Sequence, residues 1–155
     1  MEKIKVIFVC MGNICRSPMA EAVFQQLVKE RGLDEKFHIE SAGTGPWHIG
    51  QRPHTGTQQV LQKHHVSLNA RKVGQQVQPD IFEKFDYVIA MDSENKQDLK
   101  IYGDATLLLE NVQGADVIDV PDPYYDKKFE RVYQLVVKGC NTLLNRICEE
   151  QNLAC

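Results

Sequence analysis

The sequence contains no long apolar run, no basic run and no internal repeat, and each of these absences excludes a class of protein. A membrane-spanning helix needs about 20 consecutive apolar residues, so we expect no membrane partner. The N-terminal segment MEKIKVIFVC lacks the small-residue cleavage site of a secretory signal peptide. We therefore expect a cytoplasmic protein.

Positive charge is also scarce, because 18 Lys and Arg residues stand against 21 Asp and Glu residues, a formal net charge of −3. A nucleic-acid partner would require a basic surface that neutralises phosphates, so we expect none. A regular cysteine pattern is also missing, since the five cysteines lie at scattered spacings. An odd number without a regular pattern favours free thiols in a reducing compartment over a disulfide framework.

What is present is the composition of one ordinary globular domain, with 155 residues, 43% hydrophobic and 25% charged. Short β-branched runs alternate with segments of helical periodicity, and no linker divides them. We therefore predict a single α/β domain over residues 1–155, with a four-stranded parallel sheet and helices on both faces. Ser17 and Asp92 are expected to cap helices, and Gly32 to end one. The predicted strands span residues 4–9, 37–43, 85–92 and 105–110, and the predicted helices span residues 17–31, 56–65, 93–102 and 127–150.

The segment CMGNICRS, residues 10–17, connects the first predicted strand to the first predicted helix. Ligands of open α/β sheets bind beyond the carboxyl ends of the strands, and a loop that turns into a helix N-terminus directs N–H groups at an anion. Gly12 and Asn13 tolerate the positive φ that such a turn requires. The planar guanidinium of Arg16 can hold two oxygens of a phosphate. The sequence therefore predicts a phosphate-binding loop after the first strand.

Cys10 opens this loop, so the same groups act on its sulfur. A free cysteine has a pKa of about 8.5, and lowering it below 7 requires about 2 kcal/mol of preferential stabilisation of the thiolate. We expect the helix N-terminus, the loop N–H groups, Arg16 and the Ser17 hydroxyl to supply it. The alternative, a small buried cysteine without a chemical role, leaves Arg16 and Ser17 unexplained. The pattern favours a nucleophilic thiolate beneath a bound oxyanion.

Other kinds of site fit the sequence less well. The nucleotide-binding loop GxxxxGK[ST] is absent, since the chain contains no Gly-Lys pair. Cys10 and Cys15 lack a second pair at zinc-ligand spacing, and we interpret His64 and His65 as solvated surface. We expect neither a metal nor another cofactor.

Asp122 lies between two prolines in the segment VPDPYYD. Pro123 keeps it out of helical geometry, so its carboxyl group is carried on a stiff, exposed loop. An isolated Asp-Pro pair usually marks an ordinary turn. Beside a thiolate and an arginine, however, the aspartate of this pair is suited to act as a positioned acid. Asp119 and Asp126 are the nearby alternatives.

These segments resemble the low-molecular-weight protein-tyrosine phosphatases. FVCMGNICRSPMAEAVF is similar to the family's Cys-x5-Arg-Ser loop with its following helix, and DPYYD, residues 122–126, is similar to its acid loop. SAGTGPWHIG and FDYVIAMD are similar to intermediate segments, so the resemblance covers nearly the whole chain. It implies a four-stranded parallel sheet flanked by helices.

The resemblance also implies a reaction. Cys10 would be the nucleophile, Arg16 the clamp on the phosphate and transition state, and Asp122 the proton donor. The expected activity is metal-independent hydrolysis of phosphotyrosine in proteins through a thiophosphate on Cys10, with inorganic phosphate as product and competitive ligand.

The remaining site residues follow from the same resemblance. Asn13 would brace the loop with Ser41, and the Ser17 hydroxyl would bond the thiolate. Family members with a histidine before the AR segment use it in this network, whereas the segment here, VSLNARKV, is shorter and lacks it. The residues expected to contact phosphate or substrate are Met11, Gly12, Asn13, Ile14, Cys15, Ser17, Trp47, Tyr124 and Tyr125.

Two other functions remain open from the sequence. An arsenate reductase would use Cys10 and further cysteines as a redox relay, but the reductases of this fold typically carry Gln where Pro18 stands. Related arginine phosphatases carry Thr in place of Ile14. A phosphate-binding module without activity is the third reading. Cys15 is also a candidate partner for a reversible disulfide with Cys10.

Overall fold

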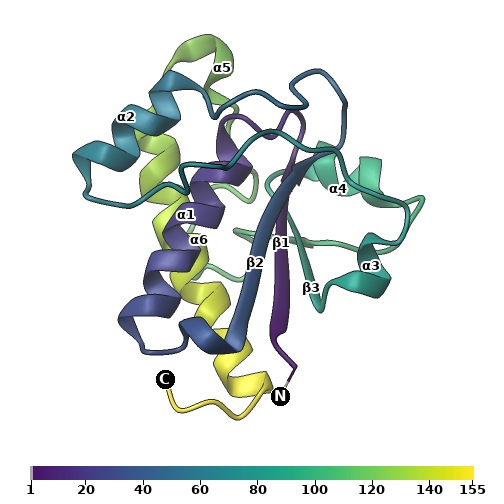
Figure 1. Cartoon of the computed structure of the whole chain (residues 1–155), viewed down its shortest axis with the longest axis vertical. Helices are drawn as coiled ribbons and strands as arrows, with labels where there is room; N and C mark the ends of the chain where they lie inside the picture. The colour runs from purple at the N-terminus through teal and green to yellow at the C-terminus, as the bar shows by residue number, and fades with distance from the viewer. Residues whose placement is uncertain (1) are drawn as a thin grey trace.

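Four parallel strands form one sheet, in the order β2–β1–β3–β4, in the computed structural model of the chain, which describes residues 2–155. All three pairings are parallel, and β1 lies between β2 and β3 with its carboxyl end at the top of Figure 1. The predicted fold class is therefore confirmed. The strands are β1 (Ile4–Cys10), β2 (Phe37–Gly43), β3 (Tyr87–Ala90) and β4 (Thr106–Leu107).

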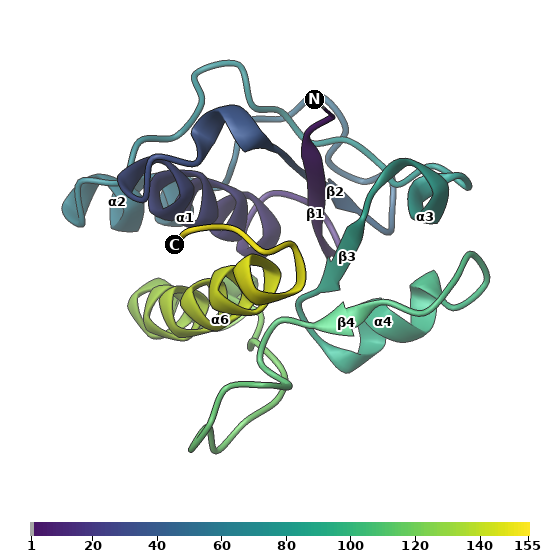
Figure 2. The same ribbon diagram turned by 90° about the horizontal axis from the view of Figure 1, so that it is seen from below.

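Helices cover both faces of the sheet, as Figure 2 shows from below. Val6 and Phe8 of β1 join the core beneath α1 and α6, whereas Ile7 and Val9 join a second core beneath α3 and α4. Successive side chains of a strand point to opposite faces, so an uninterrupted apolar run is needed here. The helices are α1 (Arg16–Glu30), α2 (Thr55–Lys63), α3 (Ile81–Lys84), α4 (Ser93–Leu99), α5 (Pro123–Asp126) and α6 (Phe129–Glu150), with a 3₁₀ turn, η1 (Asp34–Lys36).

Helix α1 begins one residue before the predicted start, and its N-cap is Cys15 rather than Ser17. The expected capping role of Ser17 is wrong because its hydroxyl lies in the first helical turn, 2.9 Å from the sulfur of Cys10. At the other end Gly32 has a φ of +70° and ends the helix as predicted. Asp92 caps α4 as predicted, accepting a 2.7 Å hydrogen bond from the backbone N–H of Asn95.

The elements that the sequence did not predict, α3, α5 and η1, are single turns, too short to show a periodicity. The predicted fourth strand is also longer than the observed β4. Its segment turns after Leu107, whose backbone N–H donates to a side-chain oxygen of Glu110 at 2.6 Å.

Two further expectations are corrected near the ends of α6. Cys148 and Cys155 form a disulfide, so the expectation that all five cysteines are free thiols is wrong. The chain reverses after α6 through a left-handed Asn152, which brings the last residue back toward the helix and could not be read from cysteine spacing. His64 is not simply solvated either, because its ring stacks on Tyr133 at 4.0 Å.

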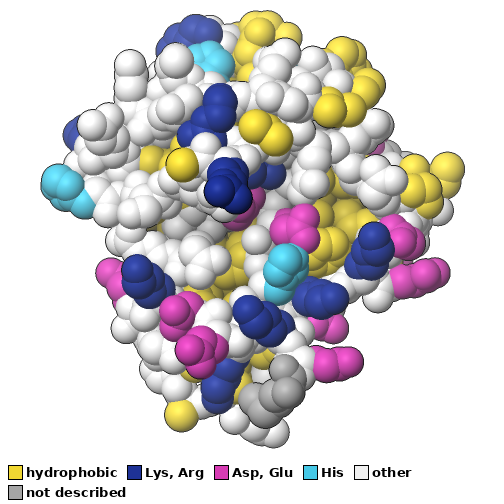
Figure 3. Space-filling view, in the orientation of Figure 1, with side chains coloured by type: hydrophobic (Ala, Val, Ile, Leu, Met, Phe, Trp, Pro, Cys, Tyr) yellow, Lys and Arg dark blue, Asp and Glu magenta, His cyan; other side chains and the backbone are white. Residues whose placement is uncertain are grey.

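In the described part of the chain, residues 2–155, no helix is both long enough and apolar enough to cross a membrane. The space-filling view shows hydrophobic side chains gathered at the upper end, over the loops that follow the strands, and mixed charges at the lower end (Figure 3).

Candidate active site

The loop of residues 10–16 follows β1 and is held from outside by its carbonyl groups. Each of four carbonyls accepts a hydrogen bond from a neighbouring segment, and in residues 2–155 the N–H groups of residues 11–15 donate to no protein acceptor. The four bonds are Thr44 N to Cys10 O (2.9 Å), Gly45 N to Met11 O (3.0 Å), His54 N to Ile14 O (2.7 Å) and Thr57 Oγ1 to Cys15 O (3.0 Å). The loop carbonyls are thus bonded to the surrounding segments. The N–H groups, which have no acceptor within the described part of the chain, are available to bind an anion.

The turn of this loop is made at Asn13, which has a φ of +57°. Gly12, predicted to share that conformation, is not in the left-handed region, so this expectation is wrong. The need for glycine there is steric, since a Cβ on Gly12 would lie 2.8 Å from the ring of His48. Gly43 has a similar reason, because a Cβ there would meet the carbonyl oxygen of Met11 at 2.8 Å.

Arg16 is 3% exposed, and one edge of its guanidinium is fixed by protein groups. Its Nη1 donates to a carboxylate oxygen of Asp92 at 2.5 Å and to the carbonyl of Val120 at 2.9 Å. Burial by itself would lower the pKa of Arg16, but the neighbouring Cys10, Asp92 and Asp122 raise it above its ordinary value. Arg16 is therefore a permanent, oriented cation at the end of the loop.

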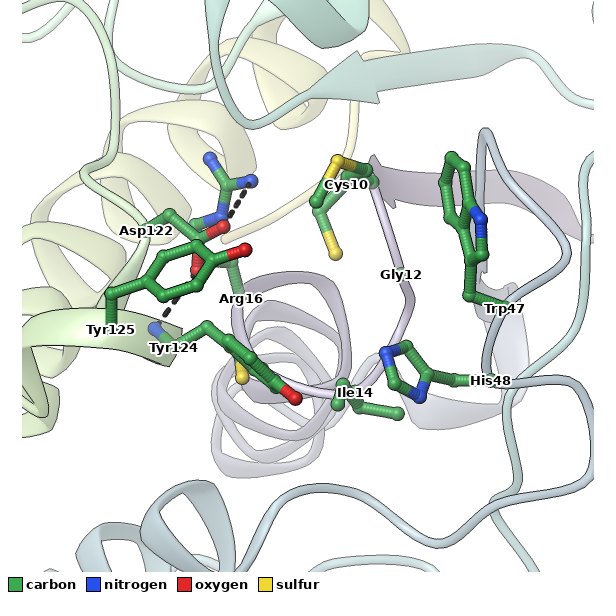
Figure 4. A pocket seen from close by; sticks show the side chains of 11 residues that line it. Cys10, Gly12, Ile14, Arg16, Trp47, His48, Asp122, Tyr124 and Tyr125 are labelled. Atoms are coloured by element: carbon green, nitrogen blue, oxygen red, sulfur yellow. Dashed lines mark hydrogen bonds and ion pairs between the residues drawn. The ribbon is translucent and has the colours of Figure 1, made fainter.

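A cavity of about 340 Å³ opens above the loop at the carboxyl ends of the strands. In Figure 4, Cys10 and Arg16 lie behind the opening, Asp122 and the two tyrosines form one side, and Trp47 and His48 form the other. The lining residues are Cys10, Met11, Gly12, Ile14, Cys15, Arg16, Trp47, His48, Asp122, Tyr124 and Tyr125. Asn13, Ser17 and Ser41, which the sequence also singled out, lie behind the loop and do not line the cavity.

The structure distinguishes Asp122 from the two neighbouring aspartates. A carboxylate oxygen of Asp122 lies 3.8 Å from Nη2 of Arg16, and its other oxygen accepts from the backbone N–H of Tyr124 at 3.0 Å. Asp119 instead accepts hydrogen bonds from the N–H and the hydroxyl of Ser93. Asp126 accepts from the N–H of the residue two positions on, outside the cavity. Asp122 is thus the aspartate of this segment that faces the cavity.

His48 lines the cavity but was not predicted from the sequence. Its ring lies against Gly12, its Nδ1 is 2.9 Å from a side-chain oxygen of Gln51, and its centroid is 6.2 Å from that of Tyr124. The sequence feature that could have indicated this role of His48 is its position next to Trp47, which was predicted to contact the substrate. Asp92 was predicted only as a helix cap, and its second role, holding Arg16, depends on the neighbouring position of β1 and β3.

Comparison with known proteins decides the family. The family model of the low molecular weight phosphotyrosine protein phosphatases matches residues 5–153. The chain is 46% identical to the low molecular weight protein-tyrosine-phosphatase YfkJ of Bacillus subtilis, over 97% of this chain and 99% of that protein, and 43% identical to PtpA of Staphylococcus epidermidis, over 97% of each. The chain belongs to this phosphatase family.

Solved structures agree with this family and with the fold described above. The crystal structure of YfkJ from Bacillus subtilis has a TM-score of 0.93 at 45% identity, covering 97% of this chain and 98% of that one. The drosophila arginine phosphatase DARP has a TM-score of 0.85 at 31% identity, covering 93% and 98%. The resemblance stated from the sequence is therefore confirmed at the level of the family.

In this phosphatase the loop is braced from behind by a residue that the sequence did not reveal. Lys72, in the shortened VSLNARKV segment, donates from its Nζ to Asn13 Oδ1 at 3.0 Å and to the carbonyl of Ser41 at 2.8 Å. Asn13 in turn donates to the hydroxyls of Ser17 and Ser41, at 2.8 and 3.0 Å. Lys72 therefore completes the network of Asn13, Ser17 and Ser41 in this chain, whose VSLNARKV segment contains no histidine.

Cys15 has a chemical environment unlike that of Cys10. It is 4% exposed, and burial, followed by the neighbouring Cys10 and Asp122, raises the pKa of its thiol to about 12. Cys15 is therefore protonated at neutral pH and a poor nucleophile in its resting state.

Proposed function

We propose that this chain hydrolyses phosphotyrosine in proteins, with Cys10 as nucleophile, Arg16 as phosphate clamp and Asp122 as general acid and base. The observation that carries the proposal is the convergence of these three side chains on one cavity. The sulfur and the fixed guanidinium lie at the two ends of a loop whose N–H groups have no protein acceptor within residues 2–155, and a carboxylate oxygen lies 3.8 Å from that guanidinium.

The reaction follows from this placement. The sulfur of Cys10 attacks phosphorus in line while Asp122 gives its proton to the departing phenol oxygen, so that the P–O bond breaks as the S–P bond forms. The Asp122 carboxylate then takes a proton from water, which attacks phosphorus and releases inorganic phosphate and the thiolate. Arg16 and the loop N–H groups stabilise the equatorial oxygens throughout, a task that bound Mg²⁺ performs in other phosphoryl-transfer enzymes.

The walls of the cavity support an aryl phosphate as substrate. Trp47, Tyr124 and Tyr125 supply aromatic surface, and Ile14 adds an apolar side chain on the loop itself. A phenyl ring gains contacts along these walls that the short side chain of phosphoserine cannot reach. We therefore place phosphotyrosine ahead of phosphoserine and of phosphoarginine, whose polar guanidinium would face the side chain of Ile14.

The other cysteines do not support an arsenate reductase. Cys140 is buried in α6, where its thiol donates to the carbonyl of Ala20, and Cys148 is bonded to Cys155. In Figure 1 the C-terminus lies at the opposite end of the molecule from the carboxyl end of β1. A relay from Cys10 would need an accessible partner thiol, and among the other cysteines that the structure describes only Cys15 lines the cavity.

Cys15 fits a protective role instead. Peroxide would oxidise the Cys10 thiolate to a sulfenic acid with release of water, and the Cys15 thiol would then displace a second water to form a disulfide. Dithiothreitol would restore both thiols. Recovery of activity after peroxide and dithiothreitol should be full in the wild type and poor in Cys15→Ser, and equal recovery in both would remove this role.

The function is tested with a phosphotyrosine peptide in the presence of EDTA and without a thiol reductant. We expect steady release of phosphate by the wild type and none by Cys10→Ser, whereas Cys140→Ala, which changes a cysteine outside the cavity, should keep its activity. An arsenate reductase would depend on the reductant, and a binding module would release no phosphate. Acid quenching of Asp122→Asn during turnover of p-nitrophenyl phosphate, whose leaving group needs little protonation, should trap phosphate on Cys10, because the second step loses its base.

A further inference from the structure

Behind the phosphate-binding loop lies a buried ion pair that the proposed reaction does not use. Lys72 is 8% exposed, and its Nζ lies 3.5 Å from a carboxylate oxygen of Glu21, whose side chain is 16% exposed. Burial raises the pKa of Glu21 and lowers that of Lys72, although the attraction between the two charges opposes both shifts. A buried pair of this kind is not a reliable source of stability, so its position beside the loop needs another explanation.

The ammonium of Lys72 fixes the orientation of the Asn13 amide. An ammonium has three N–H groups and no acceptor, and within residues 2–155 the acceptors around Nζ are Asn13 Oδ1, the Ser41 carbonyl and a carboxylate oxygen of Glu21. The backbone N–H of Gln75 also donates to Asn13 Oδ1, at 3.1 Å. Since both neighbours of Oδ1 can only donate, the amide NH₂ of Asn13 must face the opposite side, toward the two serine hydroxyls.

The direction of the next hydrogen bonds follows. Asn13 Nδ2 donates to Ser17 Oγ at 2.8 Å, so the hydroxyl proton of Ser17 is left for the sulfur of Cys10, 2.9 Å away. The second N–H of Asn13 is received by Ser41 Oγ, whose own proton goes to Glu21 at 2.5 Å. Glu21 therefore keeps Ser41 from donating toward Asn13. Each hydrogen bond in the chain from Lys72 to Cys10 is therefore donated in the direction of the sulfur.

We propose that Lys72 is a positioning residue of this site: its ammonium, held by Glu21, sets the direction of the relay Lys72–Asn13–Ser17–Cys10 and so helps to keep the sulfur ionised. The proposal rests on the proposed function, in which the Cys10 thiolate is the nucleophile. Lys72 acts from behind the loop, whereas Arg16 acts on the sulfur from the cavity side. The other charged groups that face these centres are Asp122, Asp92 and Lys127 around the cavity, and Glu21 and Glu40 around Lys72.

The test compares Lys72→Met with the double variant Lys72→Met/Glu21→Gln. The first change leaves the Glu21 carboxyl group without its cation, and the second removes both charges, so stability and charge effects can be separated. Lys63→Met, which removes a surface lysine paired with Glu130, is the matched control. The readout is the rate at which iodoacetamide alkylates Cys10 between about pH 4 and 9, followed by mass spectrometry of the peptide that contains it.

In Lys72→Met and in the double variant, we expect the midpoint of this pH dependence to rise by about one unit, equivalent to a tenfold loss of thiolate below the midpoint. In Lys72→Met, which removes a positive charge behind the loop, inorganic phosphate should protect Cys10 about tenfold less well, because the loop loses part of its positive potential. The melting temperature should fall in the single variant and recover in the double. The Lys63→Met control should match the wild type.

A double variant that folds and shows the wild-type midpoint would overturn the proposal, since Lys72 would then have no effect on the ionisation of the sulfur, whatever its effect on the melting temperature. If Lys72→Met does not fold, the double variant carries the test alone. Hydrolysis of the phosphotyrosine peptide by the wild type is measured in parallel. If the wild type does not hydrolyse the peptide but the variants show the expected midpoint shift, the proposed function is contradicted and the role of Lys72 stands.

Discussion

Two loops meet at the cavity, and they are built in opposite ways. The phosphate-binding loop, residues 10–16, is mostly buried, and its carbonyls and the Asn13 and Arg16 side chains are held by neighbouring segments. The acid loop, residues 121–127, is largely exposed, with Tyr125 81% exposed. The Asp122 side chain is 30% exposed. It is anchored by its own helix cap and the 3.8 Å approach to Arg16.

The difference agrees with what each loop has to do in the proposed function. A loop that stabilises charge must hold its donors in place before the anion arrives, because reorganising them during the reaction would cost energy. A general acid must exchange its proton with water in each turnover, and aromatic walls must admit a large substrate. Burial therefore serves the first loop and exposure serves the second. The following changes test this division, from the largest expected effect to the smallest.

Arg16→Lys should be the most damaging change to the buried loop. Lysine keeps the charge but loses the planar fork that is shared between the anion and the anchors Asp92 and Val120, so kcat/KM for a phosphotyrosine peptide should fall about a thousandfold. Arg31→Lys, on the opposite end of α1, is the control and should leave the kinetics unchanged. A loss of kcat/KM below tenfold would show that a positive charge at position 16 is enough for activity, without the planar guanidinium.

Asp122→Asn should act on kcat and on its pH dependence. The proposed mechanism requires a protonated Asp122 beside an ionised Cys10, so the wild-type rate should be highest at mildly acidic pH. In the variant, kcat should be about a hundredfold lower, and the rate should no longer decrease at alkaline pH. Steady-state rates across the pH range measure both, with Asp126→Asn as the control. A wild-type rate that still climbs above about pH 8 would contradict this assignment.

Tyr125→Ala should weaken substrate binding without changing the chemistry. Removal of one aromatic wall should raise KM for a phosphotyrosine peptide roughly threefold to tenfold, the equivalent of about 1 kcal/mol, and leave kcat within about twofold. Ile101→Ala is a matched control, since Ile101 is also 81% exposed but does not line the cavity. An unchanged KM would remove Tyr125 from the binding surface.

Glu130→Gln, outside both loops, should have the smallest effect. Hydrogen bonds from His64, Gln134 and Lys63 lower the pKa of Glu130 from 4.5 to about 2, so the ionised carboxyl group stabilises the folded state above about pH 4.5 and this contribution disappears as the pH falls toward 2. Because Glu130 is 44% exposed, solvent reduces the effect to less than about 1 kcal/mol at neutral pH. Urea unfolding of both proteins at neutral and acidic pH measures it. If the difference in the free energy of unfolding between the two proteins grew as the pH falls, the stabilising role of the ionised Glu130 would be contradicted.

Much of the fold and the cavity side of the site could be predicted from the sequence. The strand, loop and helix from Ile4 to Glu30 are contiguous, so the spacing of Cys10 and Arg16 already implied that both residues line one cavity at the carboxyl end of β1. Asp122 could be singled out because its flanking prolines restrict it locally. Short elements such as α3 and α5 could not, because a single turn carries no periodic pattern.

The sequence by itself determined the local features of this protein: apolar runs that form strands, periodic segments that form helices, and the loop that joins the first pair. The tertiary structure decided the contacts that hold Arg16 on Asp92, Asn13 on Lys72 and Cys148 on Cys155. The first two pairs are 76 and 59 positions apart, and neither position shows in its own neighbourhood which partner it will meet. Strand order and loop path set such meetings, whereas a local pattern reports only the state of its own backbone.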